Sequence, residues 1–469
     1  MAAVPMGIAA WVATNAVLMA AFVPFNPITG FLCTLFLIGA GNFLWKRILS
    51  LHELASFSIG AAIVLLAAAF LAAHEWIIFN SDAYMTFYMA DDLIYNGFLS
   101  DQARKVPLGA EPIYLPLVSA FFRSMGEPYF ASLSSLMALC GAVLFAVFGA
   151  RVAAGSEAEP DRIKAWIFIL GAVALTTNGF YINTALQSKT HGVFALHMLC
   201  ACASLYLAAR ESRPEWFVLA LFFMAAMPLF RLESGTSAFP ILVVAVAISS
   251  IPLKIRLLGV GTVSVLWGLS YLYLLGATTY FDGFQRGLVA KNLIGTGGPV
   301  GLFGVGLLAI AFVDRRGLYQ SPLNRLLSWV PSAMVAALLA ILAWHIVTRP
   351  EIFRETINGI LSILLEPSMG GLGFGVAVGV LFLLSFLFRA RLPSGWILAV
   401  PIASYLIVVA LADFHLEGQP HWGQTGALTR ILSHVMPTLM FYVVWRLVFL
   451  AKQPHLFSGT SNDSGSMRR

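Results

Sequence analysis

Long apolar runs, separated by short polar connections, dominate the chain. Each run is close to the roughly 20 residues that a helix needs to cross the hydrocarbon core of a bilayer. We place membrane spans at 6–24, 29–45, 55–78, 129–150, 164–180, 190–209, 257–276, 299–313, 326–347, 370–388, 394–411 and 431–451. Only 11% of the residues are charged, too few to cover the exterior of a soluble domain. The expected fold class is therefore all-α, a polytopic transmembrane helical bundle.

Two shorter runs, 216–230 and 236–251, flank the sequence Arg231-Leu-Glu-Ser-Gly. Each is marginal as a full crossing, and together they predict a hairpin that dips into the bilayer from one side. We expect one transmembrane domain over residues 1–456. A cytoplasmic tail, 457–469, has the polar composition of disordered segments.

The distribution of positive charge predicts an orientation. With the N-terminus in the cytoplasm, most lysines and arginines fall in cytoplasmic loops, as the positive-inside rule requires. Both termini are then cytoplasmic, and the outer loops are 80–126, 277–297, 348–370 and 412–430. The charges lie in short clusters between spans, so the expected partner is a lipid bilayer and not nucleic acid.

The longest outer loop is rich in Tyr, Phe, Met and Leu. It predicts two short helices, near Tyr84–Asn96 and Pro112–Arg123, of the kind that lie along a membrane interface. Asp82 begins the first of these, directly after a span. An apolar setting can raise a carboxylate's pKa into the range of a general base. The simpler interpretation is that Ser81 or Asp82 caps the helix, and the two roles are compatible.

Other ionisable residues gather on the outer side. Asp91 and Asp92 could bind an acceptor or a divalent cation, although a solvated helix face is the simpler explanation. Arg231 and Glu233 interrupt an apolar stretch, where charges are costly and have a partner or a function. They predict either a structural ion pair or an arginine that grips a lipid phosphate.

Two further outer segments carry donors suited to an anionic or sugar ligand. Arg286 and Lys291 lie on the predicted outer side, where the positive-inside rule expects few cations. This position favours an anionic ligand over side chains that merely extend to the lipid headgroups. His421, Trp422 and Arg430 crowd the last outer loop, whose histidines lack a recognised metal-ligand spacing. The four cysteines lie inside apolar runs and are interpreted as small buried hydrophobes.

Five short motifs follow one another in an order that resembles the GT-C superfamily of membrane glycosyltransferases, most closely the branch containing the mycobacterial terminal arabinofuranosyltransferase. The matching stretches are Ser81-Asp82-Ala83-Tyr84 to Asn96-Gly97, Glu111-Pro112 to Pro116, Arg231 to Gly235, Tyr280 to Gly283 with Val289-Ala290-Lys291, and Gly418…Trp422…Gly426…Arg430…Pro437. Ser81 replaces the first Asp of the family's pair. The family's Arg-Pro-Glu-Gly element has lost its Pro and Gly. A Gly-Met-Glu-Thr-like stretch is replaced by Ser188-Lys189-Thr190-His191-Gly192, so His191 is expected to line the acceptor or sugar pocket.

The resemblance implies a polyprenyl-phosphate-linked monosaccharide as donor, with a pentofuranose such as arabinofuranose as one option. The acceptor would be an envelope glycan or glycolipid on the periplasmic face of a bacterial inner membrane. Asp82 would be the catalytic base, and Arg231, Arg286, Lys291 and Arg430 would neutralise the phosphate. Asp91, Asp92, Glu111, Glu233, His191, His421 and Trp422 would contact the substrates. No cofactor is required, and one carboxylate predicts inversion by single displacement.

Three other functions stay open at this level. A transporter or flippase of an envelope precursor would place ionisable groups deep within the spans. A non-catalytic scaffold would not need Asp82. A ligase of lipid-linked polymers would use an oligosaccharide-diphosphate donor.

Overall fold

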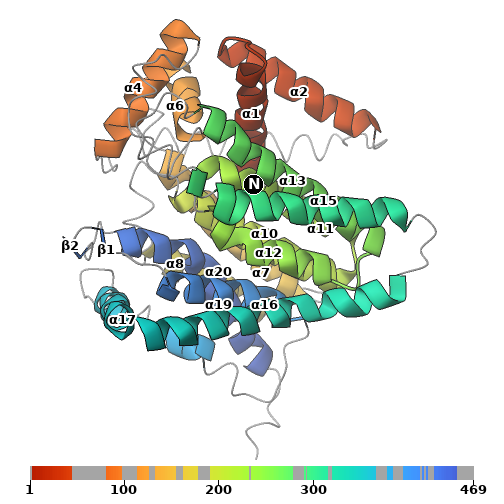
Figure 1. Ribbon diagram of the computed structural model, residues 1–469, viewed down its shortest axis with the longest axis vertical. Coiled ribbons are helices and arrows are strands. Elements are labelled where there is room, and N and C mark those ends of the chain that lie inside the picture. The colour runs from red at the N-terminus through yellow and green to blue at the C-terminus, as the bar shows by residue number, and fades with distance from the viewer. Residues whose placement is uncertain are drawn as a thin grey trace, which may run out of the picture.

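The computed structural model of the chain describes residues 3–44, 81–97, 114–125, 133–154, 162–177, 191–231, 234–277, 290–291, 293–314, 320–365, 378–383, 394–411, 415–416, 419–420 and 427–451. Across these residues the chain is helical apart from one short ribbon (Figure 1). The N-terminal half contains α1 (Ala3–Ala20), α2 (Pro27–Leu44), α4 (Ser81–Asn96), α6 (Tyr114–Met125), α7 (Leu133–Ala154), α8 (Arg162–Thr177), α10 (His191–Glu211) and α11 (Pro214–Phe230). The C-terminal half contains α12 (Ser234–Ala247), α13 (Leu253–Ala277), the π-helix η3 (Leu293–Gly297), α15 (Gly298–Val313), α16 (Gln320–Thr348), α17 (Pro350–Leu365), α19 (Trp396–Leu411), β1 (His415–Leu416), β2 (Gln419–Pro420) and α20 (Ala427–Ala451).

Each predicted span that the structure describes overlaps a helix, although α1 ends at Ala20, short of the predicted span 6–24. The span 55–78 and most of 370–388 lie outside the described residues. Five segments within the described ranges are long and apolar enough to cross a bilayer: α10, Leu253–Tyr273 of α13, Leu293–Val313, α16, and Ile431–Phe449 of α20. The chain is therefore a membrane-embedded helical bundle, as its sequence predicts.

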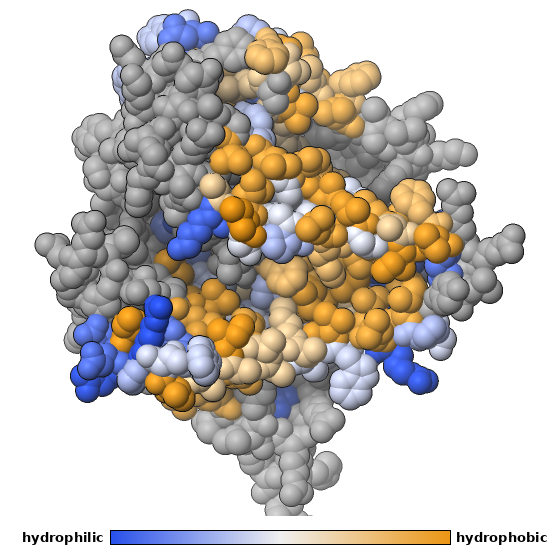
Figure 2. Space-filling model, viewed as in Figure 1, coloured by the Kyte–Doolittle hydropathy of each residue, from blue (hydrophilic) through white to orange (hydrophobic). Residues whose placement is uncertain are grey.

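The outward face over α15 and α16 shows where lipid would lie. Apolar side chains cover most of this face. Hydrophilic residues gather beside α17 on one side of the view, and near the ends of α15 and α16 on the other side (Figure 2). Trp329 and Trp344 are exposed on α16. With 29 residues, α16 is about 43 Å long at the usual rise per residue. That length exceeds the roughly 30 Å of a hydrocarbon core, so its two ends would reach the two interfaces.

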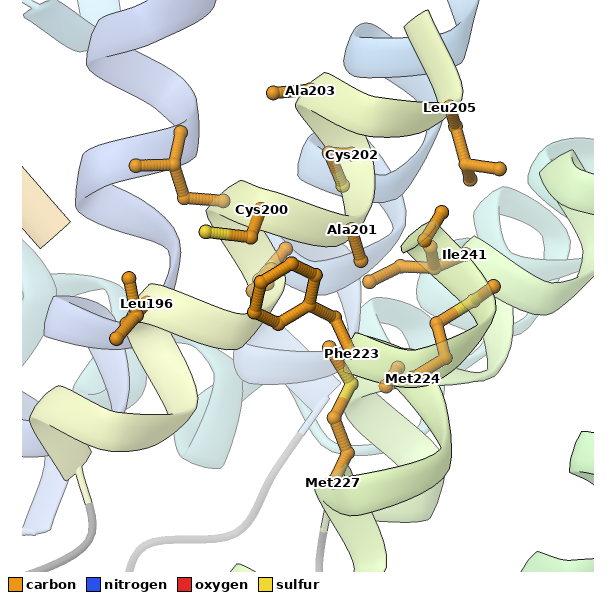
Figure 3. Packing of buried hydrophobic residues seen from close by; sticks show 14 of the residues in the cluster. Leu196, Cys200, Ala201, Cys202, Ala203, Leu205, Phe223, Met224, Met227 and Ile241 are labelled. Carbon is orange, nitrogen blue, oxygen red and sulfur yellow. The ribbon is translucent and has the colours of Figure 1, made fainter. Parts of the chain in front are cut away.

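Helix α10 forms the centre of the bundle. It contacts α7, α11, α19 and α20, and every residue from its N-terminus through Ala208 is buried. Small side chains such as Cys200 and Cys202 let these neighbours approach, and the buried side chains of Phe223 and Met224 lie on the adjacent α11 (Figure 3). Cys140, Cys200 and Cys202 are buried free thiols and Cys33 is half-buried, so three of the four confirm the expected buried position.

Glycines bring α13 and α15 into close contact. A Cβ on Gly268 would lie 3.0 Å from the Cα of Gly301. A Cβ on Gly304 would lie 2.7 Å from the carbonyl oxygen of Gly261 and 2.8 Å from the amide nitrogen of Val265. Small residues commonly line such interfaces in membranes, because dispersion contacts replace the hydrophobic driving force there.

The predicted break near Arg231 is present. Helices α11 and α12 lie on either side of it, and Arg231 has extended backbone angles, φ −148° and ψ 143°. With 17 residues, α11 is about 25 Å long, short of a full hydrocarbon core. The hairpin is packed inside the bundle, because α11 contacts α10 and α13 while α12 contacts α16 and α19.

Helices α4 and α6 confirm the two helices predicted in the first outer loop, and they contact each other. Gly97 ends α4 with φ +75°, a conformation that glycine adopts without strain. Its N–H donates to the Leu93 carbonyl at 3.0 Å, and its own carbonyl accepts from the Phe25 N–H at 2.6 Å. These bonds tie the end of α4 to the connection between α1 and α2.

Candidate functional site

Arg231 lies where α11 ends, and its side chain is buried. One guanidinium nitrogen, Nη1, lies 2.9 Å from Nε2 and 3.3 Å from Nδ1 of His191. His191 is the first residue of α10 and is also buried. The break in the hairpin and the start of the central helix therefore meet at one end of the bundle.

A second histidine, His434, continues this contact from α20. Its Nε2 lies 2.7 Å from Nδ1 of His191, although 243 positions separate the two residues in the sequence. The planes of the two rings are inclined by 27°, and Phe194 packs against the His434 ring with centroids 4.7 Å apart. The Phe194 ring therefore packs against His434 on the side of α10 and restricts its position beside His191.

Tyr405 of α19 closes the chain of contacts. Its hydroxyl oxygen lies 2.9 Å from Nδ1 of His434 and donates to the carbonyl of Ile431 at 2.8 Å. All four side chains, Arg231, His191, His434 and Tyr405, are less than 9% exposed. We call this set the buried polar chain. It joins four helices, α10, α11, α19 and α20, at the end where α10 and α20 begin.

A guanidinium beside imidazole rings suits an anionic ligand with hydroxyl groups. Arginine offers a planar fork of donors that matches phosphate oxygens. Imidazole nitrogens can accept or donate a hydrogen bond according to tautomer. Ionisable groups buried at membrane depth are expensive and usually mark a functional path or a specific partner.

The remaining predicted residues are placed as follows. Asp82 lies in the first turn of α4, where the positive end of the helix dipole favours a carboxylate. The structure does not describe its side chain. Glu111, Glu233, Arg286, His421 and Trp422 lie outside the described residues, as do the predicted cytoplasmic tail and most of the segment 280–293. Their roles stay predictions.

Asp91 and Asp92 have partners on their own pair of helices. Asp91 forms an ion pair with Arg123 of α6, Oδ1 to Nε 2.8 Å, and Asp92 accepts from the Asn96 side-chain amide at 2.7 Å. Asp92 is buried, so only Asp91 fits the expected solvated face. The ion pair joins α4 to α6, whereas the Asp92–Asn96 hydrogen bond lies within α4. A role for either carboxylate in binding substrate stays a prediction.

Lys291 is exposed and lies just before η3. Arg430 lies in the first turn of α20, four residues before His434 and hence on the same helix face. Of the predicted site residues with described side chains, Arg231 and His191 are brought together. Among the described residues, no three His, Cys, Asp or Glu side chains are grouped as metal ligands, so the expected optional cation has no cluster there.

Sequence reasoning missed His434 and Tyr405. Both lie inside runs that were counted as ordinary spans, and neither belongs to a quoted motif. The available signal was the polar residue itself, since a histidine within a membrane span normally has a partner. No family model, curated protein or solved structure was found to match the chain.

Proposed function

We propose that the protein is a GT-C type glycosyltransferase that moves a monosaccharide from a polyprenyl-phosphate donor to an envelope glycan or glycolipid. One observation carries the proposal. His191 and Arg231 come from two separate stretches that the resemblance to the GT-C superfamily singled out, 188–192 and 231–235, and they are in contact. His434, which belongs to no quoted motif, joins them from α20. Stretches that serve one active site should converge in this way, whereas unrelated loops would have no reason to do so.

The buried polar chain supplies the phosphate-binding part of the proposed site. Displacing lipid phosphate from the sugar converts a phosphodiester into a phosphomonoester and adds negative charge to its oxygens. Arg231 would stabilise that charge in a setting of low dielectric, where a fixed cation is most effective. Arg430 is one helical turn from His434 and would add a second cation. Arg286 and Lys291 remain further proposed phosphate ligands.

Asp82 would act as the base. Its carboxylate takes the proton from an acceptor hydroxyl, and the acceptor oxygen attacks the anomeric carbon as the bond from that carbon to the phosphate oxygen breaks. The single displacement inverts the anomeric configuration. The site would face the periplasm of a bacterial inner membrane, since nucleotide sugars are absent there and a lipid-linked donor is required.

The test is release of free polyprenyl phosphate from a panel of polyprenyl-phosphate monosaccharides, with purified protein in nanodiscs. The wild-type protein should release it from at least one donor, and Asp82→Asn and Arg231→Gln should not. Arg213→Gln is the matched control, because Arg213 is exposed and pairs only weakly, at 3.7–4.0 Å, with Glu211 and Glu215. Release by every variant alike, or by none with any donor, would refute the proposal.

A transporter is the second candidate, and one residue favours it. His197 lies deep in α10 between Phe223 and Phe230, and its Nε2 is buried without a described hydrogen-bond partner. An ionisable group at that depth is typical of transport paths. Movement of a labelled lipid-linked sugar across proteoliposomes, abolished by His197→Phe, would favour transport over transfer.

A further inference from the structure

Pro228 interrupts the backbone hydrogen bonding of α11 within the last turn of the helix, just before Arg231. Proline has no N–H, so the carbonyl of Met224, one turn earlier, loses the donor that an ordinary helix would supply. Met224 and Pro228 are both buried, so this carbonyl is also shielded from solvent. A proline within a membrane helix is tolerated where a neighbour satisfies the freed backbone group.

A side chain of α13 supplies the missing donor. The indole Nε1–H of Trp267 donates to the Met224 carbonyl at 2.8 Å. Trp267 is fully buried, and α11 and α13 are in contact. Without this bond the Met224 carbonyl would keep the full desolvation cost of a buried acceptor. The indole therefore takes the place of one backbone amide of α11.

Trp267 is itself held at a fixed place on α13. Its neighbour Gly268 lies where α13 meets α15, and an added Cβ there would lie 3.0 Å from the Cα of Gly301. Such close backbone packing leaves α13 no room to move toward α15. The indole is thus a fixed point against which the end of α11 is located.

The end of α11 is also held from α10. Phe230 packs against the ring of His197 with centroids 4.5 Å apart and planes inclined by 69°. Arg231 follows Phe230 directly and has extended backbone angles. The residues from Pro228 onward lie beyond the missing backbone bond, so contacts with α10 and α13 set the direction in which they leave α11.

We infer that Trp267 is a positioning residue for Arg231: its indole N–H replaces the amide that Pro228 lacks, and it fixes the direction in which the last turn of α11 presents the guanidinium. This inference rests on the proposed function, in which Arg231 binds the phosphate of the lipid-linked donor. The planar guanidinium binds phosphate by direction as well as by charge, so a small rotation of the turn weakens binding although the charge stays.

The first experiment replaces Trp267 with benzothienylalanine, an amino acid of nearly the same shape whose ring sulfur carries no hydrogen. The packing is kept and only the donor is lost. Affinity for polyprenyl phosphate in phosphatidylcholine nanodiscs should fall about tenfold, as expected for one buried hydrogen bond. The same replacement at Trp329, which is 69% exposed on α16, is the control and should change nothing. Unchanged affinity after the replacement of Trp267 would overturn the inference.

The second experiment tests whether the indole compensates for the proline. In Pro228→Ala the new amide N–H can donate to the Met224 carbonyl, and the indole donor is no longer needed. Benzothienylalanine in place of Trp267 should therefore change the affinity less than about twofold in this background. Comparison within one background cancels any change that Pro228→Ala itself causes. An equal loss in both backgrounds would show that Trp267 acts by another route, and would overturn the inference.

The third experiment tests whether the effect reaches the phosphate through Arg231. Residues that act as a unit have non-additive effects. In Arg231→Gln, replacing Trp267 with benzothienylalanine should therefore bring no further loss of affinity for polyprenyl phosphate. A further loss as large as in the wild-type background would overturn the inference.

The outcomes separate this inference from the proposed function. Binding and release of polyprenyl phosphate by the wild-type protein, with no effect of the replacement at Trp267, would overturn the inference alone. No binding by the wild-type protein would overturn both, because Arg231 would have no phosphate to bind. Denaturant unfolding tests the bond without a ligand. The replacement should lower the unfolding midpoint in the wild-type background and not in Pro228→Ala, and no lowering in the wild-type background would overturn the inference.

Discussion

Two of the buried arginines in the described part of the chain, Arg231 just before α12 and Arg256 on α13, have different surroundings. Arg256 is surrounded by oxygen acceptors: it donates to the carbonyls of Ile251 at 2.9 Å and Val246 at 2.5 Å, and to the Asn324 side chain. Arg231 instead faces the ring nitrogens of His191. Carbonyl oxygens are fixed acceptors, whereas an imidazole nitrogen can exchange one partner for another.

The difference separates a structural arginine from a functional one. Arg256 satisfies the Val246 carbonyl at the C-terminal end of α12, which has no partner within the helix, and the Ile251 carbonyl in the connection to α13. It also binds α13 to α16 through Asn324. Arg231 lies in the gap between two helices and contacts side chains whose hydrogen bonds can be rearranged. We therefore expect Arg256 to determine stability and Arg231 to determine binding.

The largest expected effect on stability is at Arg256. Arg256→Met should lose about 4 kcal/mol of unfolding free energy, because it leaves buried carbonyls unpaired and removes several hydrogen bonds to a charged donor. Denaturant unfolding of the protein in detergent micelles measures this loss. Lys254→Met, at a neighbouring exposed cation, is the matched control and should change little. If the two variants unfold at the same denaturant concentration, Arg256 is not the structural arginine described above.

Two glycines in α15 allow a variant that affects stability without touching the proposed site. In Gly304→Ala the new methyl group would meet the backbone of α13, and we expect a loss of about 2 kcal/mol from overpacking. Gly306→Ala is its control, because nothing lies within 4 Å of the added atom. Denaturant unfolding of both variants measures the loss. We expect the affinity of the folded fraction for ligand to stay unchanged, which would identify the effect as one on stability alone. Equal stability would refute the close contact between α13 and α15.

Arg231 should matter less for stability than Arg256 does. Arg231→Gln keeps an N–H donor for His191, so the expected loss is about 1 kcal/mol of unfolding free energy. The same denaturant unfolding assay measures it. A loss as large as that of Arg256→Met would break the comparison, because Arg231 would then be a structural residue too.

The smallest effect is expected at the ion pair between Arg151 and Glu211, near the C-terminal ends of α7 and α10. Arg151 donates from Nε and Nη2 to the Glu211 carboxylate at 2.9 and 3.1 Å, and its side chain is 46% exposed. Exposed pairs contribute little, so Arg151→Gln should lose about 0.5 kcal/mol. Unfolding at low and high salt would check this, since the difference should shrink as salt screens the pair. A salt-independent loss above about 2 kcal/mol would show instead that the pair is effectively buried.

The sequence predicts the helices of this molecule well, because a membrane span has a strong local signal. The hydropathy of residues 191–211 or 431–449 is enough to place α10 and α20. The break at Arg231 was also predictable, since a charged residue interrupts an apolar run there. Both features depend only on neighbours in the chain.

Long-range contacts were not predictable in the same way. His191 and His434 meet across 243 positions, and no local pattern states that α10 and α20 are neighbours. Arg256 directly precedes the predicted span 257–276 and so falls in a predicted loop, yet the structure buries it against carbonyl oxygens. The positive-inside rule concerns which side of the membrane a charge lies on, and it carries no information on burial.

The most direct test of this account is the affinity of polyprenyl phosphate for three proteins in nanodiscs: wild type, Arg231→Gln and Arg213→Gln. Removing a buried phosphate-binding arginine should weaken binding about 100-fold, as expected for loss of a charge-assisted hydrogen bond. Arg213→Gln should bind like the wild type. Tight binding by wild type that survives unchanged in Arg231→Gln would contradict the account, because the buried arginine at the hairpin break would then not be the phosphate site.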